Sequence, residues 1–268
     1  MKIFFTIAAF LVLFEAQSQV FTQGARSTAL GNVNSVFQDE QSLLGNQAGL
    51  GALKNYAVIA AAQRRFMLSE LDAIAAGATL PTRSGTFGLL VQNFGYDEFR
   101  QQKIGLAYGR RLFEHFYAGA SFDYFQTRIP EYGSKGTVSV QVGVQAELGK
   151  QVLIGAHIAN PAKVEIADSD RLPTILNMGL AWTPSPKATL AFELEKDIDF
   201  PIRAKGGIEY RAAEPLFLRV GFASNPTTAH FGIGLLLKER IKVDVSSSYH
   251  QVLGFSPSFG VAYAWGKG

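Results

Sequence analysis

The chain has no cysteine and few charged residues, and each shortage excludes a class of protein. Without cysteine there is no disulfide, thiolate zinc site, cysteine nucleophile or lipid-modified cysteine. Charged residues make up only 18% of the 268 residues, and the formal net charge is +3. Because the sequence also lacks a run rich in Lys or Arg, it has no electrostatic footprint for nucleic acid, and no nucleic-acid partner is expected.

Long apolar runs are also scarce. The one clear run, residues 3–14, follows Met1 and Lys2. It is shorter than the roughly 20 residues of a transmembrane helix but has the size of the apolar region of a signal peptide. Small residues at Ala16 and Ser18 predict cleavage after Ser18, so residues 1–18 are expected to be a signal peptide for the Sec pathway. The alternative is a buried N-terminal helix. Beyond Ser18, any membrane span must consist of strands.

Catalytic and metal-binding motifs are missing as well. The sequence contains neither G-x-S-x-G nor a phosphate-binding loop. Its four histidines, His115, His157, His230 and His250, are dispersed without ligand spacing. The acidic stretch at residues 167–170 lacks the glycine and distal glutamate of an EF-hand loop. We therefore expect a non-catalytic protein with no metal and no cofactor.

What the sequence does have is strict alternation of apolar and polar residues. In residues 137–148 one face is polar or glycine, and the other consists of Val138, Val140, Val142, Val144, Ala146 and Leu148. A run of about twelve residues exceeds the usual five or six of a soluble strand and suits a tilted strand that crosses a bilayer.

Similar segments recur along the chain. We count about fourteen, an even number as a closed bacterial barrel requires: residues 55–66, 70–80, 85–94, 99–110, 116–128, 137–149, 151–159, 173–183, 188–197, 202–211, 216–224, 228–237, 241–250 and 255–265. Tight turns alternate with longer connections, of which 129–136 and 160–172 are the longest. The abrupt first connection near residues 67–69 is the weak point, and the count could change by two. The fold class predicted is all-β, a transmembrane antiparallel β-barrel over residues 55–268.

Two sets of side chains stand out on the predicted strands. Aromatic residues near strand ends suit a membrane-interface girdle, with core aromatics as the alternative: Trp182, Tyr210, Tyr263 and Trp265. Inward charges of both signs are clustered on neighbouring strands: Glu193, Glu195, Arg203, Lys205, Glu209, Arg211 and Arg219. We interpret the charges as a cross-strand ion-pair ladder; the alternative is a polar path that lines a solute pore.

Residues 19–54 show no alternation and are rich in Gly, Ala, Asn and Ser. A barrel of about fourteen strands has a lumen too wide for its own side chains to fill. Many of the inward positions are Gly or Ala, for example Gly119 and Gly143, which leaves further space. The segment 19–54 is therefore expected to fold into the lumen as a hatch.

The same segment carries a family resemblance. The run Gln23-Gly24-Ala25-Arg26, continuing to residue 32, resembles the opening of mature FadL-like outer-membrane barrels. Residues 36–40 and 44–50 are similar to two further elements of that superfamily. The resemblance implies a fourteen-stranded barrel in the outer membrane with a hatch in its lumen. Residues of the hatch are candidates for gating or ligand contact, the alternative being plain structural hydrogen bonding: Gly24, Arg26, Gly31, Asp39, Asn46, Gln47, Gly49 and Leu50.

Within that superfamily the form Asn46-Gln47-Ala48-Gly49-Leu50 most resembles the PorV/PorQ-type barrels of Bacteroidetes, which are tied to type IX protein secretion. The chain departs from the pattern because it is short and ends in Lys267-Gly268 rather than on an aromatic residue.

Two functions follow from these resemblances. The first is a partner subunit of an outer-membrane secretion or assembly complex, with lipid and other outer-membrane proteins as partners. The second is a FadL-like transporter of hydrophobic small molecules, with a hydrophobic ligand or lipid as partner. Most of the expected outer connections are short and leave little material for an extracellular ligand cup, which favours the partner subunit.

Overall fold

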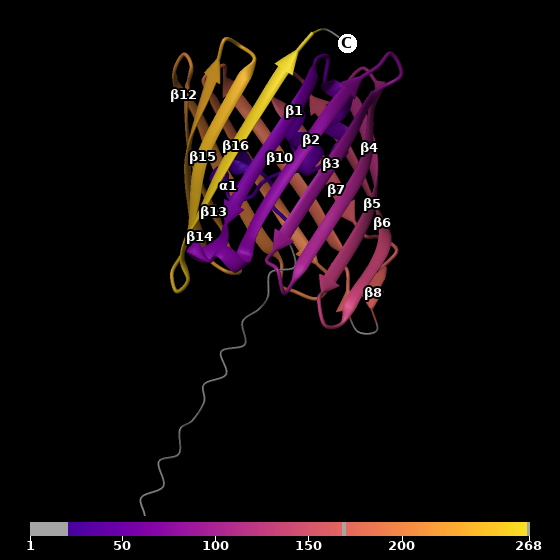
Figure 1. The fold of residues 1–268 in the computed structure, drawn as a ribbon. Coiled ribbons are helices and arrows are strands. Elements are labelled where there is room, and N and C mark those ends of the chain that lie inside the picture. The colour runs from indigo at the N-terminus through magenta and orange to yellow at the C-terminus, as the bar shows by residue number, and fades with distance from the viewer. Residues whose placement is uncertain (1–20, 168–169, 267–268) are drawn as a thin grey trace, which may run out of the picture.

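Fourteen strands form one closed antiparallel barrel, as predicted (Figure 1). The structure, a computed structural model, describes residues 21–167 and 170–266; the predicted signal peptide lies outside the described residues. The wall strands are β1 Tyr56–Arg64, β2 Asp72–Pro81, β3 Thr86–Gly95, β4 Arg100–Phe113, β5 Phe116–Ile129, β6 Gly133–Leu148, β7 Val152–Ala159, β10 Ile175–Ser185, β11 Ala188–Asp197, β12 Arg203–Ala213, β13 Leu216–Ala223, β14 Thr228–Leu237, β15 Ile241–His250 and β16 Gly254–Trp265. A separate hairpin of β8 Glu165–Ala167 and β9 Asp170–Arg171 lies between β7 and β10.

The barrel closes where the first wall strand meets the last. β1 pairs antiparallel with β16, with Tyr56 opposite Trp265 and Gln63 opposite Ser258. Each wall strand therefore hydrogen-bonds to two neighbours, and the sheet has no open edge. Closure of this kind is what a β-structure needs in hydrocarbon, where water cannot satisfy the backbone.

Alternation along the strands separates an apolar outer surface from a polar lumen. On β6, Val138, Val140 and Val142 are exposed, whereas Ser139, Gly143 and Gln145 on the opposite face are buried. Successive side chains of a strand point to opposite faces, so the buried set faces the lumen. Other wall strands expose large apolar residues in the same way, among them Leu106, Phe122, Val220 and Val245. A continuous apolar outer belt of this kind is the surface of a transmembrane barrel.

The strand connections define two ends of the barrel. We call the end with residues 65–71, 96–99, 130–132, 160–174, 198–202, 224–227 and 251–253 the loop end, and the opposite end the turn end. The predicted long connection 129–136 was wrong. β5 and β6 stay paired as far as Ile129 and Gly133, so most of that stretch extends the wall beyond the apolar belt. The first connection contains two 3-10 turns, η3 Arg65–Met67 and η4 Ser69–Leu71, and the strand count holds.

Residues 21–53, the main described part of the predicted hatch, lie inside the barrel, and Lys54 at its end is exposed (Figure 1). This segment, the hatch, contains α1 Ala25–Ala29, η1 Glu40–Leu44 and η2 Gln47–Ala52. Among the described residues, we find no helix with the length and hydropathy needed to cross a membrane. Leu43 and Leu50 of the hatch pack with Ile59 and Leu90 of the wall in a buried apolar cluster. The hatch therefore contributes side chains to the hydrophobic core.

Glycines on the lumen wall let the hatch backbone approach closely. A Cβ atom at Gly207 of β12 would lie 2.6 Å from the Cα of Leu30, and one at Gly221 of β13 would lie 2.7 Å from the carbonyl carbon of Leu30. Real Cβ atoms do not come this near to backbone, so any larger residue would force the hatch away. The glycines at inward positions thus shape a seat for the segment that fills the lumen.

Candidate functional site

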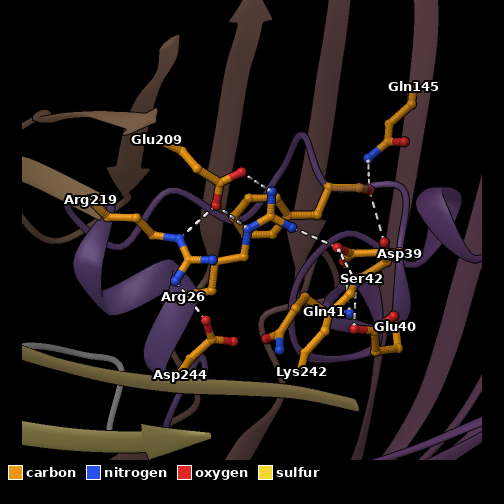
Figure 2. A network of polar contacts seen from close by, with 11 residues as sticks. Arg26, Asp39, Glu40, Gln41, Ser42, Gln145, Glu209, Arg219, Lys242 and Asp244 are labelled. Atoms are coloured by element: carbon orange, nitrogen blue, oxygen red, sulfur yellow. Dashed lines mark hydrogen bonds and ion pairs between the residues drawn. The ribbon is translucent and has the colours of Figure 1, made fainter. Parts of the chain in front are cut away.

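Arg26 of α1 is the centre of an ion-pair network that joins the hatch to the wall (Figure 2). Its Nε and Nη2 donate to the two carboxylate oxygens of Glu209 at 2.9 and 2.8 Å. Its Nη1 lies 2.5 Å from Oδ2 of Asp39, within the hatch. The guanidinium also covers the Phe37 ring, with 4.7 Å from Cζ to the ring centroid. A two-pronged bond of this kind fixes the orientation as well as the position of a guanidinium.

Two wall cations complete the network (Figure 2). Arg219 of β13 donates from Nε to Glu209 at 2.5 Å and from Nη1 to Asp244 of β15 at 2.6 Å. Lys242 of β15 lies 3.2 Å from Asp39 and 2.8 Å from Glu40. The side chains are largely shielded from solvent, so the pairs interact more strongly than surface ion pairs do. The network ties α1 and η1 to β12, β13 and β15.

The two hatch carboxyls of this network, Asp39 and Glu40, have pKa values shifted in opposite directions. Burial by itself would raise the pKa of Asp39, but the charges of Lys242 and Arg26 outweigh it and hold that pKa below its usual range. Burial raises the pKa of Glu40, and the negative charge of Asp39 raises it further. Although burial opposes it, the carboxylates of Glu209 and Asp39 raise the pKa of Arg26, which therefore stays charged. Asp39 is the firmly ionised carboxyl of the pair.

A second group of charges holds the middle of the hatch. Nζ of Lys205 lies 3.0 Å from Glu193 and 2.6 Å from Glu195, and it donates to the backbone oxygen of Asn32 at 3.1 Å. Glu193 in turn accepts from the backbone N–H groups of Asn34 and Ser35 at 3.0 and 2.8 Å. Lys205 and Glu193 are fully shielded in their side chains. Residues 32–35 have no regular structure, so these wall charges supply the partners that their backbone needs.

The predicted charge ladder is thus two separate groups. Glu193, Glu195 and Lys205 form one, with Arg203 added 3.8 Å from Glu195. Glu209 and Arg219 belong to the Arg26 network. Arg211 joins neither group among the described contacts, and this part of the expectation was wrong. It faces the lumen near the turn end, where it lies 3.7 Å from the exposed Glu214 and beside the Phe217 ring.

The remaining predicted hatch residues are buried and contact other parts of the hatch or the lumen wall. The Asn46 amide donates to Ser35, Val144 and Ala156 backbone oxygens at 3.0, 3.1 and 3.2 Å. Gln47 donates to the backbone oxygen of Gly45 at 2.7 Å. The other four serve as turns or core: Gly24 and Gly31 with positive φ, Gly49 against the Phe37 carbonyl, and Leu50 in the apolar cluster.

The aromatic residues predicted for a girdle lie on the outer surface. Tyr263 and Trp265 stack at the turn end of β16, with ring centroids 5.5 Å apart, and Tyr56 stacks on Trp265 at 6.0 Å. Trp182 and Tyr210 are exposed in the last part of β10 and β12.

A cavity of about 650 Å³ lies at the loop end, between the hatch and the wall. The hatch contributes Phe21, Gln23, Asn34, Leu44 and Gly45. The wall and loops contribute Gln92, Gln101, Gln102, Lys103, Phe125, Gln126, Thr127, Ser139, Gln141, His157, Ala159, Asn160, Ile166, Leu172, Pro173, Ile175, Asn177, Asp197, Asp199 and Phe200. The volume falls within the usual range of about 300–1,000 Å³ for small-molecule sites.

This cavity and its lining residues are not predicted from the sequence. Polar amides recur at inward positions toward the loop end of β3, β6 and β10, where Gln92, Gln141 and Asn177 lie, and that pattern was the available signal. In the sequence His157 stands out only as one of four histidines without metal-ligand spacing. Among residues 21–167 and 170–266, no group of three or more His, Cys, Asp or Glu side chains is placed to hold a metal ion.

Comparison with solved structures finds several proteins with a similar fold. The chain superposes on the Pseudomonas putida toluene transporter TodX with a TM-score of 0.71 at 11% identity, covering 92% of this chain and 99% of that one. The Ralstonia pickettii toluene transporter TbuX gives 0.69 at 11% identity, with 90% and 97% covered. A Pseudomonas aeruginosa FadL homologue gives 0.61 at 10% identity, with 90% and 98% covered.

At such low identity the likeness establishes the fold and not the activity. No protein-family model matches the chain, and no curated protein does. The chain therefore shares the overall fold of these three proteins, and its own barrel has fourteen strands with the N-terminal segment in the lumen.

Proposed function

We propose that the chain is a FadL-like channel of the bacterial outer membrane that admits hydrophobic or amphipathic small molecules. The observation that carries the proposal is the cavity at the loop end, whose inner boundary is the hatch itself, at Phe21, Asn34 and Leu44. A molecule held there has the hatch between it and the turn end. Passage then requires the hatch to shift, which assigns the gating role to the residues that pin it, foremost Arg26 and Asp39.

The names of the structural neighbours support this direction. TodX and TbuX are described as toluene transporters, and their barrels share the fold of this chain. Their activity comes to this chain only as part of the proposal. The cavity adds an observation of its own, because it combines apolar residues such as Phe125 and Leu172 with polar ones.

Short outer connections disfavour a transporter only if a ligand site needs long external loops. Here the cavity is built mainly from the ends of wall strands and from the hatch, and the connection 160–174 contributes only part of its lining. Short loops are thus compatible with a site inside the barrel.

The second candidate is the partner subunit expected from the PorV/PorQ resemblance. The residues that carry the resemblance, Asn46 to Leu50, are buried within the barrel and contact the hatch and lumen wall. They cannot reach another protein through the wall, so they support the fold more than a docking role. Secretion-complex partners therefore rank below the transport function.

Export and processing belong to the same proposal. The chain is exported by the Sec pathway, cleaved after Ser18, and inserted as a hatch of residues 19–54 and a barrel of residues 55–268. The outer-membrane fraction of expressing cells should contain a protein whose first residue is Gln19. A chain that keeps residues 1–18, or that stays in the inner membrane, would contradict this part.

Transport is tested in cells that carry the chain in an intact outer membrane. Cells with the wild-type chain should accumulate labelled naphthalene or labelled 2-naphthol faster than cells with an empty vector. Ser139→Trp fills the cavity from β6, and uptake should fall to the vector level. Val140→Trp adds the same bulk to the outer face of that strand and should leave uptake unchanged. Equal uptake in all four strains would reject transport, and co-purification with other outer-membrane proteins would then support the partner subunit.

A further inference from the structure

The cavity at the loop end has two chemically different sides. On one side the rings of Phe21 and Phe125 lie 6.1 Å apart between centroids. Nζ of Lys103 lies over both rings, 5.5 and 5.9 Å from their centroids. This side offers apolar surface, and the one charge on it is directed at ring faces.

The other side carries hydrogen-bond acceptors that have no donor within the described part of the chain. These atoms are Oδ1 of Asn34, Nδ1 of His157, Oδ1 of Asn177 and Oδ2 of Asp197. A fifth unpaired acceptor, Oε1 of Gln92, lies beside the aromatic side, because Gln92 of β3 is paired with Lys103 of β4. None of the five residues is more than 5% exposed. Buried polar atoms are nearly always satisfied, so five unsatisfied ones around a single cavity point to a ligand or water that satisfies them.

Hydrogen bonds fix the His157 ring as an acceptor. The Gln141 amide N–H donates to Asp123, so the carbonyl oxygen of Gln141 is the atom that faces His157. Nε2 of His157 lies 2.9 Å from that oxygen and must therefore carry the proton. In the neutral ring this leaves Nδ1 without a hydrogen, as a bare acceptor.

Two other acceptors are fixed in the same manner. Gln92 donates from Nε2 to the backbone oxygen of Thr22 at 2.8 Å, which directs Oε1 away from that contact. Asp197 accepts from the backbone N–H of Asp199 at 3.2 Å through Oδ1, and Oδ2 remains. A carboxylate has no donor in any orientation. The acceptor character of this side therefore does not depend on how the Asn34 and Asn177 amides are oriented.

From this geometry we infer that the cavity binds an amphipathic molecule whose polar end donates hydrogen bonds, through a hydroxyl or an amine, while its apolar part lies against Phe21 and Phe125. The inference rests on the proposed transport function and names the substrate class of the same site. A pure hydrocarbon would leave the buried acceptors unpaired, which is costly. A carboxylate end would face Asp197 and the other acceptors with no hydrogen to share.

Four probes of one ring system test the inference by binding to the full chain in detergent micelles, with protein-free micelles as the blank. They are naphthalene, 2-naphthol, 2-naphthylmethylamine and 2-naphthoate. The naphthol, the amine or both should bind at least about tenfold more tightly than naphthalene and naphthoate, because sites built to hydrogen-bond a substrate discriminate strongly against analogues that lack the group. Preference for the naphthol identifies a hydroxyl ligand, and preference for the amine identifies an ammonium ligand held by Asp197.

Variants assign the preference to the acceptor side. Asn177→Leu replaces an amide whose oxygen has no partner among the described residues, so the barrel should fold, and the selectivity for the donor-bearing probe should fall about tenfold. Ser246→Ala is the matched control: its hydroxyl is also buried and unpaired, but it lies on β15 away from the cavity lining. Asp197→Asn should weaken the amine more than the naphthol.

The outcomes separate this inference from the transport function. If naphthalene or naphthoate binds as tightly as the donor-bearing probes, or if Asn177→Leu keeps the preference, the inference is overturned and transport stands. If none of the four probes binds, the ligand site is refuted, and the transport proposal fails with it.

Discussion

The guanidinium of Arg26 meets the carboxylate of Glu209 through two parallel hydrogen bonds of 2.9 and 2.8 Å. One residue lies in the first helix of the hatch and the other on the lumen face of β12, 183 positions later. This contact joins the hatch directly to the wall, and it leads to the first prediction.

Arg26→Gln should loosen the hatch. The change leaves Asp39 and Glu209 with less compensating charge in a shielded site, and breaking such a pair costs about 3–5 kcal/mol when it is buried. Because both partners of the Arg26–Glu209 pair keep some solvent contact, we expect the lower half of that range. The free energy of unfolding should drop, and cells should become more permeable to small antibiotics. Arg64→Gln is the control, since Arg64 and Asp72 form an exposed pair worth at most about 1 kcal/mol. Equal effects of the two changes would contradict the assignment.

Lys205→Met should destabilise the chain more than the double variant Lys205→Met with Glu193→Gln. Removing Lys205 alone leaves Glu193 and Glu195 without their shared cation in a site sealed from solvent. Removing the charge on Glu193 as well relieves part of that cost. Urea unfolding of both single variants and the double variant should give a coupling energy of about 1–3 kcal/mol. A coupling near zero would show that the two side chains act independently.

Low pH should loosen the hatch, because protonation of Asp39 removes its ion pairs with Arg26 and Lys242. The pKa of Asp39 in the folded chain lies below its ordinary value of 3.8. The unfolded chain therefore binds more protons between the two pKa values, and stability rises with pH there. The contribution is complete above about pH 4 and is lost as the pH falls further. Asp39→Asn should speed amide exchange of residues 24–50 at pH 7, and the difference from wild type should shrink below pH 4.

Glu40→Gln should have the opposite effect on the stability of the hatch at pH 7. Because the folded state raises the pKa of Glu40 above its ordinary value of 4.5, the charged form is disfavoured in the hatch. The stability linked to this group is present in full below pH 4.5 and is lost as the pH rises through the folded pKa. The neutral variant should therefore slow amide exchange of the hatch at pH 7 and match the wild type near pH 4. Faster exchange at pH 7 would mean that the ion pair with Lys242 outweighs burial.

Gly221→Ala should displace the hatch although it adds a single methyl group. The new Cβ would lie 2.7 Å from the carbonyl carbon of Leu30 and even nearer to the backbone nitrogen of Gly31. Overpacking of this kind costs about 1–3 kcal/mol. Gly260→Ala on β16 is the control, because its nearest atoms lie at an ordinary 3.4 Å. Thermal unfolding and antibiotic permeability should change for the first variant and not for the second.

The sequence was sufficient for the wall and for the place of the hatch. Alternation such as Val138 to Leu148 is local, and it fixes which side chains face the lipid whatever the neighbouring strand is. The contacts inside the lumen cannot be predicted from a local sequence pattern in this way. Whether Lys205 meets Glu193 depends on the register of β11 against β12 and on the path of residues 32–35, neither of which has a local signal.

The same limit explains the errors. Arg211 alternates correctly onto the inner face, but its height along the barrel places it near Glu214, apart from the other charges. The connection at residues 129–136 is polar, and polarity does not distinguish a loop from strands that continue past the membrane. The cavity is lined by seven wall strands, two connections and the hatch, so no single segment of the sequence predicts it.

The seam between β1 and β16 also sets an order of events during assembly. The wall becomes a cylinder only when the last strand, ending at Trp265, finds Tyr56 and its neighbours. The hatch precedes β1 in the chain, so it has been synthesised before any of the wall and is present throughout the growth of the sheet. The hatch is therefore enclosed only if it has already docked against the lumen-wall glycines when β1 and β16 pair.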